Sequence, residues 1–270
     1  MGLWDSVVRG LFGSGSDKPN TVLQGSLQTL PERFQLMHVL IIDRSGSMCR
    51  HTNDVREALA TQIETLKCAP GAEATAVCVI AFNDDWEVLL PPTPIMRVRD
   101  QIRYQPDGNT NLYGSVRDIF DQLLAWHLSM RTQGNPVRLL VTLFCDGEHT
   151  PDENRLFREA RGQLPREAGV QSALIYASIQ DVVRTIIEHQ HDEVRLASRG
   201  MLDNRIDVQV IGFGVSGEAI AANLGLTREH GTSVDANANG MERSIQAVTD
   251  RVQSAMKEIV FVGSEDAHDD

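Results

Sequence analysis

The chain has 270 residues, a hydrophobic fraction of 41% and a formal net charge of −12 at pH 7. This length suits one large α/β domain or two small ones, and the composition is that of a globular protein. The acidic balance argues against nucleic acid as the main partner, because a phosphate backbone attracts Lys and Arg. No apolar run approaches the roughly 18–20 residues that span a bilayer, and no cleavable secretory signal is recognisable.

The N-terminal segment reads GLWDSVVRGLF over residues 2–12, with apolar side chains at helical spacing on one face. We therefore expect an amphipathic helix within residues 1–12, followed by a linker over 13–33 that begins with the Gly- and Ser-rich GSGSDKPN. So short a helix is only marginally stable alone, so we expect its apolar face to pack against another surface. That surface is its own domain, a protein partner or a membrane. Gly2 and Ser6 also fit the myristoylation pattern.

From residue 34 onward, apolar strand candidates alternate with amphipathic helix candidates, and the main strands are continuous hydrophobic runs. This pattern indicates a doubly wound α/β fold, with a mostly parallel central sheet flanked by helices on both faces. We place this domain at 34–262, with an insertion within 165–204 and an acidic, disordered tail at 263–270. The predicted strands are 34–43, 74–82, 86–90, 137–146, 205–214 and 232–237, with a further candidate at 171–178. The predicted helices are 53–66, 116–128, 151–164, 179–194, 216–226 and 241–259.

The four cysteines are scattered without the paired spacing of a metal site. Cys78 and Cys145 lie in apolar strand-like runs, so we expect them to be buried free thiols. Free thiols favour a reducing compartment, and the sequence therefore predicts a cytoplasmic protein.

Two predicted strands end in aspartate, at Asp43 and Asp146, and parallel strands present their carboxyl ends at one edge of a sheet. Ser45 and Ser47 alternate in the first loop, and Thr110 follows a glycine in a separate loop. These side chains offer only carboxylate and hydroxyl oxygens. Hard oxygen ligands select Mg²⁺, Mn²⁺ or Ca²⁺ over zinc or copper, and Mg²⁺ is our first expectation.

The charge of this set suggests a role in binding. Two carboxylates neutralise a divalent cation only formally, and neutral hydroxyls donate weakly, so the cation stays electrophilic. Mg²⁺ takes six ligands, and five side chains leave a position for an outside donor. We expect an Asp or Glu carboxylate of a protein partner to occupy that position.

Three segments carry a family resemblance: DRSGSM at 43–48, GNTNLYGSV at 108–116 and CDGEHT at 145–150. They resemble the three metal-binding loops of the von Willebrand factor A (vWA) domain over roughly residues 34–262. The resemblance implies a doubly wound α/β fold with a metal-ion-dependent adhesion site (MIDAS). The stretches 104–116 and 212–226 are most similar to stand-alone bacterial and phage members, which implies protein binding, often beside stress-response, defence or AAA-ATPase machinery. The implied metal ligands are Asp43, Ser45, Ser47, Thr110 and Asp146.

Several neighbouring residues are candidates for partner contact or for holding water near the metal: Arg44, Asn109, Asn111, Glu148 and His149. We interpret EHQHDE at 188–193 as a polar helix end rather than a second metal site. Two alternatives stay open. One is a Mg²⁺-dependent phosphoester hydrolase, with His149 or Glu148 as its base. The other is a structural oligomer subunit. We expect no enzyme, because no Walker-type loop or GxSxG elbow occurs.

Overall fold

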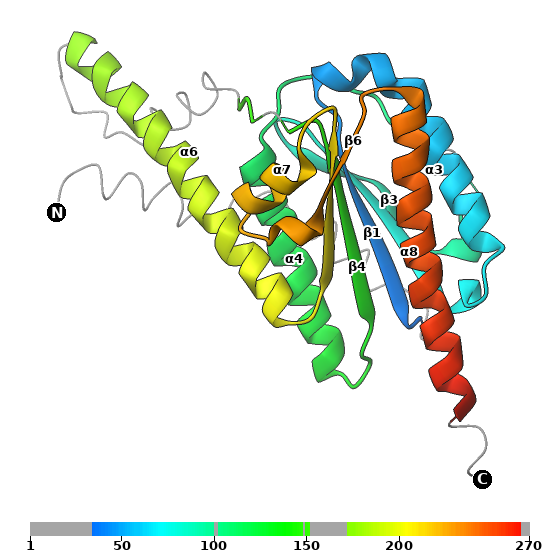
Figure 1. Ribbon diagram of the computed structural model, residues 1–270. Helices are drawn as coiled ribbons and strands as arrows, with labels where there is room; N and C mark the ends of the chain where they lie inside the picture. Colours follow the sequence, from blue (N-terminus) through cyan, green and yellow to red (C-terminus); the bar gives the residue numbers. More distant parts are fainter. Residues whose placement is uncertain (1–33, 100–101, 148, 152–171, 266–270) are drawn as a thin grey trace.

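The computed structural model of the chain describes residues 34–99, 102–147, 149–151 and 172–265. These residues form one six-stranded sheet in the order β3-β2-β1-β4-β5-β6, with helices on both of its faces (Figure 1). The strands are β1 (Leu36–Asp43), β2 (Thr75–Phe82), β3 (Trp86–Pro94), β4 (Arg138–Cys145), β5 (Asp207–Phe213) and β6 (Gly231–Val234). The helices are η1 (Gly46–His51), α3 (Thr52–Lys67), η2 (Ala72–Ala74), η3 (Ile95–Arg97), α4 (Leu112–Thr132), α6 (Ser172–Asp203), α7 (Gly217–Asn223), η4 (Arg228–His230) and α8 (Ala238–Glu265).

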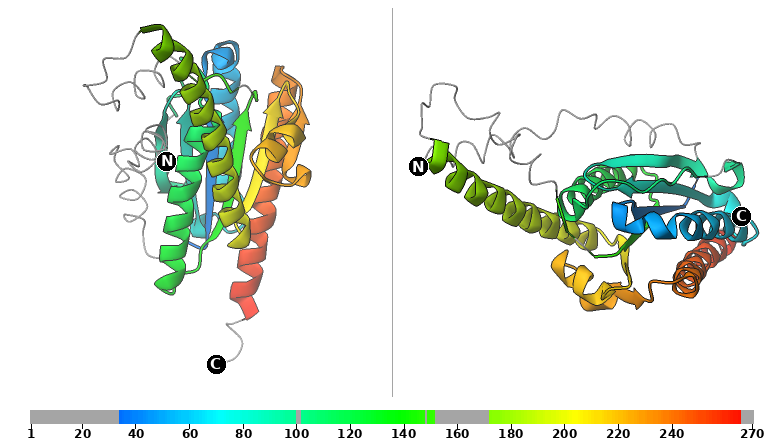
Figure 2. Two further views of the ribbon diagram at one scale, coloured as in Figure 1. Left: turned by 90° about the vertical axis from the view of Figure 1, so that its left-hand side faces the viewer. Right: turned by 90° about the horizontal axis from the view of Figure 1, so that it is seen from above.

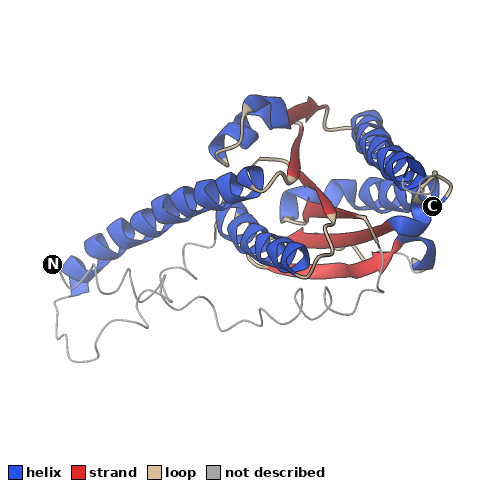
Figure 3. Cartoon of the chain, turned by 90° about the horizontal axis from the view of Figure 1, so that it is seen from below, coloured by secondary structure: helices blue, strands red, loops and turns tan. Residues whose placement is uncertain are grey.

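The sheet is mixed but mostly parallel. β1 pairs in parallel with β2 and β4, and β5 pairs in parallel with β4 and β6, whereas β3 runs antiparallel to β2 at one edge. Helices α3 and α8 cover one face, and α4, α6 and α7 cover the other (Figures 1 and 3). The predicted doubly wound α/β fold is therefore confirmed.

The hydrophobic core lies in two layers, one on each side of the sheet. All of β1 is buried, and its side chains alternate between the layers. Met37 and Val39 pack in the layer under α4, α6 and α7, whereas Leu40 and Ile42 pack in the layer under α3 and α8. A strand covered on both sides must be apolar at every position, which explains the continuous hydrophobic runs in the sequence.

The edge strand β3 is longer than its predicted span of 86–90. It continues through a proline-rich segment to Pro94, with irregular register against β2. Proline lacks the N–H that a central strand needs, but an edge strand has one unpaired side and tolerates it. The PPTP segment at 91–94, beyond the predicted span, therefore extends the strand.

The strand candidate at 171–178 is wrong. Helix α6 runs without interruption from Ser172 to Asp203, and Figures 1 and 2 show it extending beyond the sheet at its N-terminal end. A strand followed by a helix needs a turn, and the sequence contains neither Gly nor Pro between Ser172 and Arg199. The segment 165–204, within which we expect an insertion, contains the whole of this helix. The helix predicted at 151–164 falls almost wholly outside the described residues.

Helix α8 continues to Glu265, past the predicted end at 259 and into the segment that we interpreted as a tail. The rest of that tail, like the predicted N-terminal helix and linker over 1–33, lies outside the described residues. Cys78 and Cys145 are buried free cysteines, as predicted. Within the described ranges, no helix combines the length and apolar character needed to cross a bilayer.

Candidate metal centre

The two aspartates of the predicted site follow neighbouring strands. β1 ends at Asp43, and Asp146 comes directly after β4. The parallel register pairs Ile42 with Phe144, so the two chains leave the sheet side by side at the same edge. Asp43 is fully buried, whereas Asp146 is half-buried.

The first loop is folded around the Asp43 carboxylate. Its Oδ1 accepts a hydrogen bond of 2.8 Å from the Ser45 backbone N–H. The Tyr104 hydroxyl donates to the backbone carbonyl of Asp43 at 2.6 Å. The chain then turns into η1 at Gly46, so the loop is held from both sides before the helix begins.

A chain of side-chain hydrogen bonds continues from this loop to the third one. The Ser45 and Ser47 hydroxyl oxygens are 2.9 Å apart, and the Ser47 hydroxyl donates to Asp146 Oδ2. Both serine hydroxyls therefore lie between the two carboxylates, as their alternation in the sequence suggested.

The loop that carries Thr110 is fixed to both of the other loops through its backbone. The Gly46 N–H donates to the Gly108 carbonyl at 3.0 Å. Thr110 forms an isolated antiparallel bridge with Thr150, with N–H···O distances of 3.2 and 2.9 Å. Thr110 itself is buried. The structure thus brings the three predicted loops together.

One supporting residue was missed by the sequence reasoning. Asn83, directly after β2, is buried and donates from Nδ2 to the Asp107 carbonyl at 3.0 Å and to the Asp107 Oδ1 at 2.7 Å. Its own carbonyl accepts from the Asn111 N–H at 2.7 Å. Asn83 therefore supports both ends of the Thr110 loop. In the sequence, FNDDW gives only the signal of a turn between two strands.

The electrostatics of the centre fit a cation. Burial and the nearby negative charge of Asp146 raise the pKa of Asp43 above its ordinary range, although hydrogen bonds from Ser45 oppose the shift. Asp43 Oδ2 is buried and has no hydrogen-bond partner among the described residues. A buried carboxylate oxygen without a donor, in one cluster with a second carboxylate and two hydroxyls, suits a hard divalent cation.

Three of the other predicted contact residues make interactions within the protein. Arg44 is largely buried and pairs with Glu87 at 3.1 Å and with Asp107 at 3.5 Å. Asn109 contacts Asp84 through its backbone N–H at 3.0 Å. The Asn111 backbone meets Asn83 as described above. These contacts brace the Thr110 loop against the β2–β3 turn.

His149 packs on Tyr113 of α4, with ring centroids 4.2 Å apart, and His191 of α6 approaches the same ring at 4.9 Å. Burial, with a smaller contribution from His191, lowers the pKa of His149 to about 4. Glu148 lies outside the described residues. Among the described residues, no group of three or more His, Cys, Asp or Glu is arranged to hold a metal. The segment 188–193, which we interpreted as a polar helix end, lies within α6, because that helix continues to Asp203.

No protein-family model matches the sequence, and no curated protein matches it. Among solved structures, the chain is similar to the pilus adhesin SpaC from Lactobacillus rhamnosus GG in its open conformation, with a TM-score of 0.52 and 13% identity over 84% of this chain and 31% of that chain. The PilB minor pilin from Streptococcus sanguinis matches with a TM-score of 0.46 and 13% identity over 84% of this chain and 63% of that chain. Proximal thread matrix protein 1 from the mussel byssus, with a zinc-occupied MIDAS motif, matches with a TM-score of 0.44 and 12% identity over 82% of this chain and 46% of that chain.

The chain thus spans less than two thirds of the length of each of these proteins. At this level of identity the likeness bears on the fold alone. The likeness to SpaC and the strand order agree with the doubly wound α/β fold.

Proposed function

We propose that the chain is a metal-dependent protein-binding module, in which a divalent cation joins the three loops to an acidic residue of a protein partner. The observation that carries this proposal is the hydrogen-bonded series from Asp43 through Ser45 and Ser47 to Asp146, beside a backbone-anchored Thr110 loop. It places two carboxylates and the serine hydroxyls in one cluster at the carboxyl edge of a parallel sheet, where such folds bind ligands.

Five residues would hold the cation: Asp43, Ser45, Ser47, Thr110 and Asp146. When bound, a cation would supply positive charge that an incoming carboxylate can coordinate. Asp43 contributes a buried carboxylate, and the half-buried Asp146 lies nearer the solvent. The hydroxyls add ligands without adding negative charge, so an acidic partner is not repelled. Mg²⁺, Mn²⁺ and Ca²⁺ all suit this oxygen set.

Titration calorimetry with Mg²⁺, Mn²⁺ and Ca²⁺ tests the metal. We expect one cation per chain, and no measurable binding in Asp43→Ala or in the Ser45→Ala/Ser47→Ala double variant, with unchanged circular dichroism. Asp203→Ala, which alters an exposed carboxylate on α6, serves as the control. An unchanged affinity in the loop variants would contradict the proposal.

The partner is tested by affinity capture from the native organism with the full chain, in Mg²⁺ and in EDTA. We expect a protein that is retained only with metal and only by the unaltered chain. A partner held equally well by Asp43→Ala would show that the metal does not mediate binding. The identity of the captured protein decides whether the setting is stress response or defence, and the free cysteines favour a cytoplasmic location.

We further propose that the chain is not an enzyme. Among the described residues, neither buried ring nitrogen of His149, the described candidate for a base in the motif loops, has a hydrogen-bond partner, and the ring packs on Tyr113. It is therefore poorly placed to take a proton from water at the metal. Phosphoester turnover with Mg²⁺ or Mn²⁺ that is lost in Asp43→Ala would overturn this view.

A further inference from the structure

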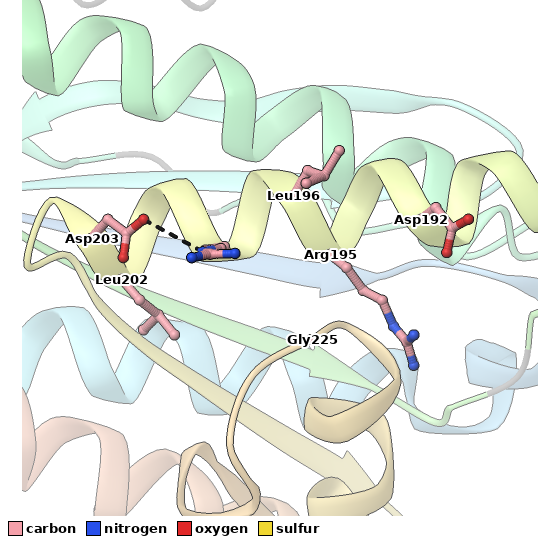
Figure 4. A pocket seen from close by; sticks show the side chains of 7 residues that line it. Asp192, Arg195, Leu196, Leu202, Asp203 and Gly225 are labelled. Atoms are coloured by element: carbon pink, nitrogen blue, oxygen red, sulfur yellow. Dashed lines mark ion pairs between the residues drawn. The ribbon is translucent and has the colours of Figure 1, made fainter.

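A groove of about 500 Å³ runs along the C-terminal half of α6 (Figure 4). Arg195 points from α6 toward the loop at Gly225, and its Nε donates to the Asn223 carbonyl at 3.3 Å. Leu196 is 70% exposed, more than any other exposed large hydrophobic residue in the described part of the chain. The groove is lined by Asp192, Arg195, Leu196, Arg199, Leu202, Asp203 and Gly225.

The charges around this groove have both signs. Arg199 and Asp203 form an exposed pair at 3.8 Å, which contributes little to stability and is easily exchanged for another partner. Asp192 and Arg195 provide another negative and another positive charge nearer the middle of α6. A groove that is lined by Leu196 and Leu202 and bordered by charges of both signs suits an amphipathic helix with one acid and one base, rather than a strongly charged ligand.

The described chain begins against helix α4, which packs beside α6. Phe34 stacks on Trp126 of α4, with ring centroids 6.2 Å apart and an interplanar angle of 2°. Leu124, two residues earlier on α4, lies against Gly200 of α6, since a Cβ added there would be 2.9 Å from its Cδ2. The N-terminal segment therefore joins the fold in the same helical layer as the groove.

We propose that residues 2–12 of the chain dock in this groove as an amphipathic helix. Their apolar face, which the sequence leaves without a cover, would lie over Leu196 and Leu202. Asp5 and Arg9 are one helical turn apart and would meet the oppositely charged groups on the groove's borders. This proposal is independent of the metal site and uses a different surface.

The connection favours contact within one chain. If residues 13–33 behave as the flexible coil that their Gly- and Ser-rich start predicts, their mean span is about 25 Å. A linker of that kind gives an effective concentration in the millimolar range. A contact with a dissociation constant of about 1 mM between separate molecules would then be at least half formed within one chain.

Hydrogen exchange read by mass spectrometry tests the docking in the full chain. We expect amides in residues 2–12 to exchange at least about twofold faster in Leu196→Asp than in the unaltered chain. Conversely, the double variant Val7→Asp/Leu11→Asp should increase the rate of amide hydrogen exchange in residues 192–203 of α6. Leu128→Asp alters another exposed leucine, on α4 and outside the groove, and should change neither segment.

Other occupants of the groove give different outcomes. Protection of 2–12 that rises with protein concentration, together with a dimer in sedimentation, would mean that a second copy docks there, and would overturn the proposal. Equal exchange of 2–12 in all variants would also overturn it. So would slower exchange of 2–12 only when phosphatidylcholine–phosphatidylserine vesicles are added, because the helix would then bind a membrane surface. Concentration-independent protection that Leu196→Asp removes would support it.

Discussion

The Ser47 hydroxyl donates a hydrogen bond to Oδ2 of Asp146, a residue 99 positions further along the chain. This contact joins the loop after β1 to the loop after β4, and it is available because the two strands are parallel neighbours. Ser47 therefore has two tasks in the proposed site: it presents a hydroxyl oxygen as a ligand, and it orients the carboxylate that would be the third loop's ligand.

Because of these two tasks, Ser47→Ala should lower the affinity for Mg²⁺ by about tenfold or more, the range seen when a group that orients a metal ligand is removed. Titration calorimetry measures this change directly. Ser254→Ala, an exposed serine on α8, is the matched control and should leave the affinity unchanged. Equal affinities in both variants would mean that Ser47 neither binds the cation nor orients Asp146.

Asp43→Asn should have opposite effects on stability with and without metal. In EDTA, the variant removes a buried negative charge next to Asp146 while Oδ1 can still accept from the Ser45 N–H. We expect its midpoint of thermal unfolding to rise by roughly 2–4 °C for each kcal/mol recovered. With millimolar Mg²⁺, only the unaltered chain should gain stability. A lower midpoint in EDTA would show that the Asp43 charge does not strain the metal-free fold.

Much of this arrangement could be predicted from the sequence, for a physical reason. Continuous apolar runs are typical of buried parallel strands. The residues that follow such strands lie at the same edge of the sheet, so the sequence alone places Asp43 and Asp146 together. The alternating Ser45 and Ser47 then fall between them. These inferences depend on local pattern and on one topological rule.

Other features depend on contacts between distant segments and could not be predicted. Asn83 supports Asp107, 24 residues away, and nothing in the turn sequence indicates that reach. The extension of β3 to Pro94 depends on its edge position, which is a property of the strand order. The start of α6 was ambiguous because a short apolar run fits a buried strand and a helix equally well.

The hydrogen bonds that Asn83 makes to the Thr110 loop lead to a prediction about Gly108. Gly108 has φ of +72°, and a Cβ added there would be 2.7 Å from Asp84 Oδ2 and 3.1 Å from Asn83 Nδ2. Gly108→Ala should therefore displace these side chains, move the Thr110 loop and weaken Mg²⁺ binding as well as stability. Gly134→Ala provides a matched control, since Gly134 has φ of +78° with nothing within 4 Å of an added Cβ.

Both variants should lose about 1 kcal/mol of unfolding free energy through backbone strain alone. Only Gly108→Ala should lose more than that and also lose metal affinity. Urea unfolding and calorimetry on the two variants separate these effects. Identical metal affinities would mean that the β2–β3 turn does not position the Thr110 loop.

His38 should make the protein less stable in mild acid. It is buried in β1, with Nε2 3.4 Å from Thr142 Oγ1, and burial, helped by the positive charge of Arg251 on α8, lowers its pKa to about 4. In the unfolded chain a histidine titrates near its ordinary value of about 6.5. Between these two values the unfolded state binds the extra proton, so stability falls as the pH falls from about 6.5 to about 4.

At pH 4.5 the loss attributable to His38 should be roughly 2–3 kcal/mol relative to pH 7.5. Urea unfolding at the two pH values measures the total change, to which His149 also contributes because its pKa is lowered to about 4 as well. His38→Gln should make the total change smaller by the His38 share, because glutamine does not titrate. What is compared is the change in unfolding free energy between the two pH values in the variant and in the unaltered chain. A loss of stability from altered packing lowers both values in the variant equally and does not affect this change. His230→Gln, at the surface in η4, should keep the full pH dependence. If His38→Gln keeps it as well, the acid sensitivity comes from other groups.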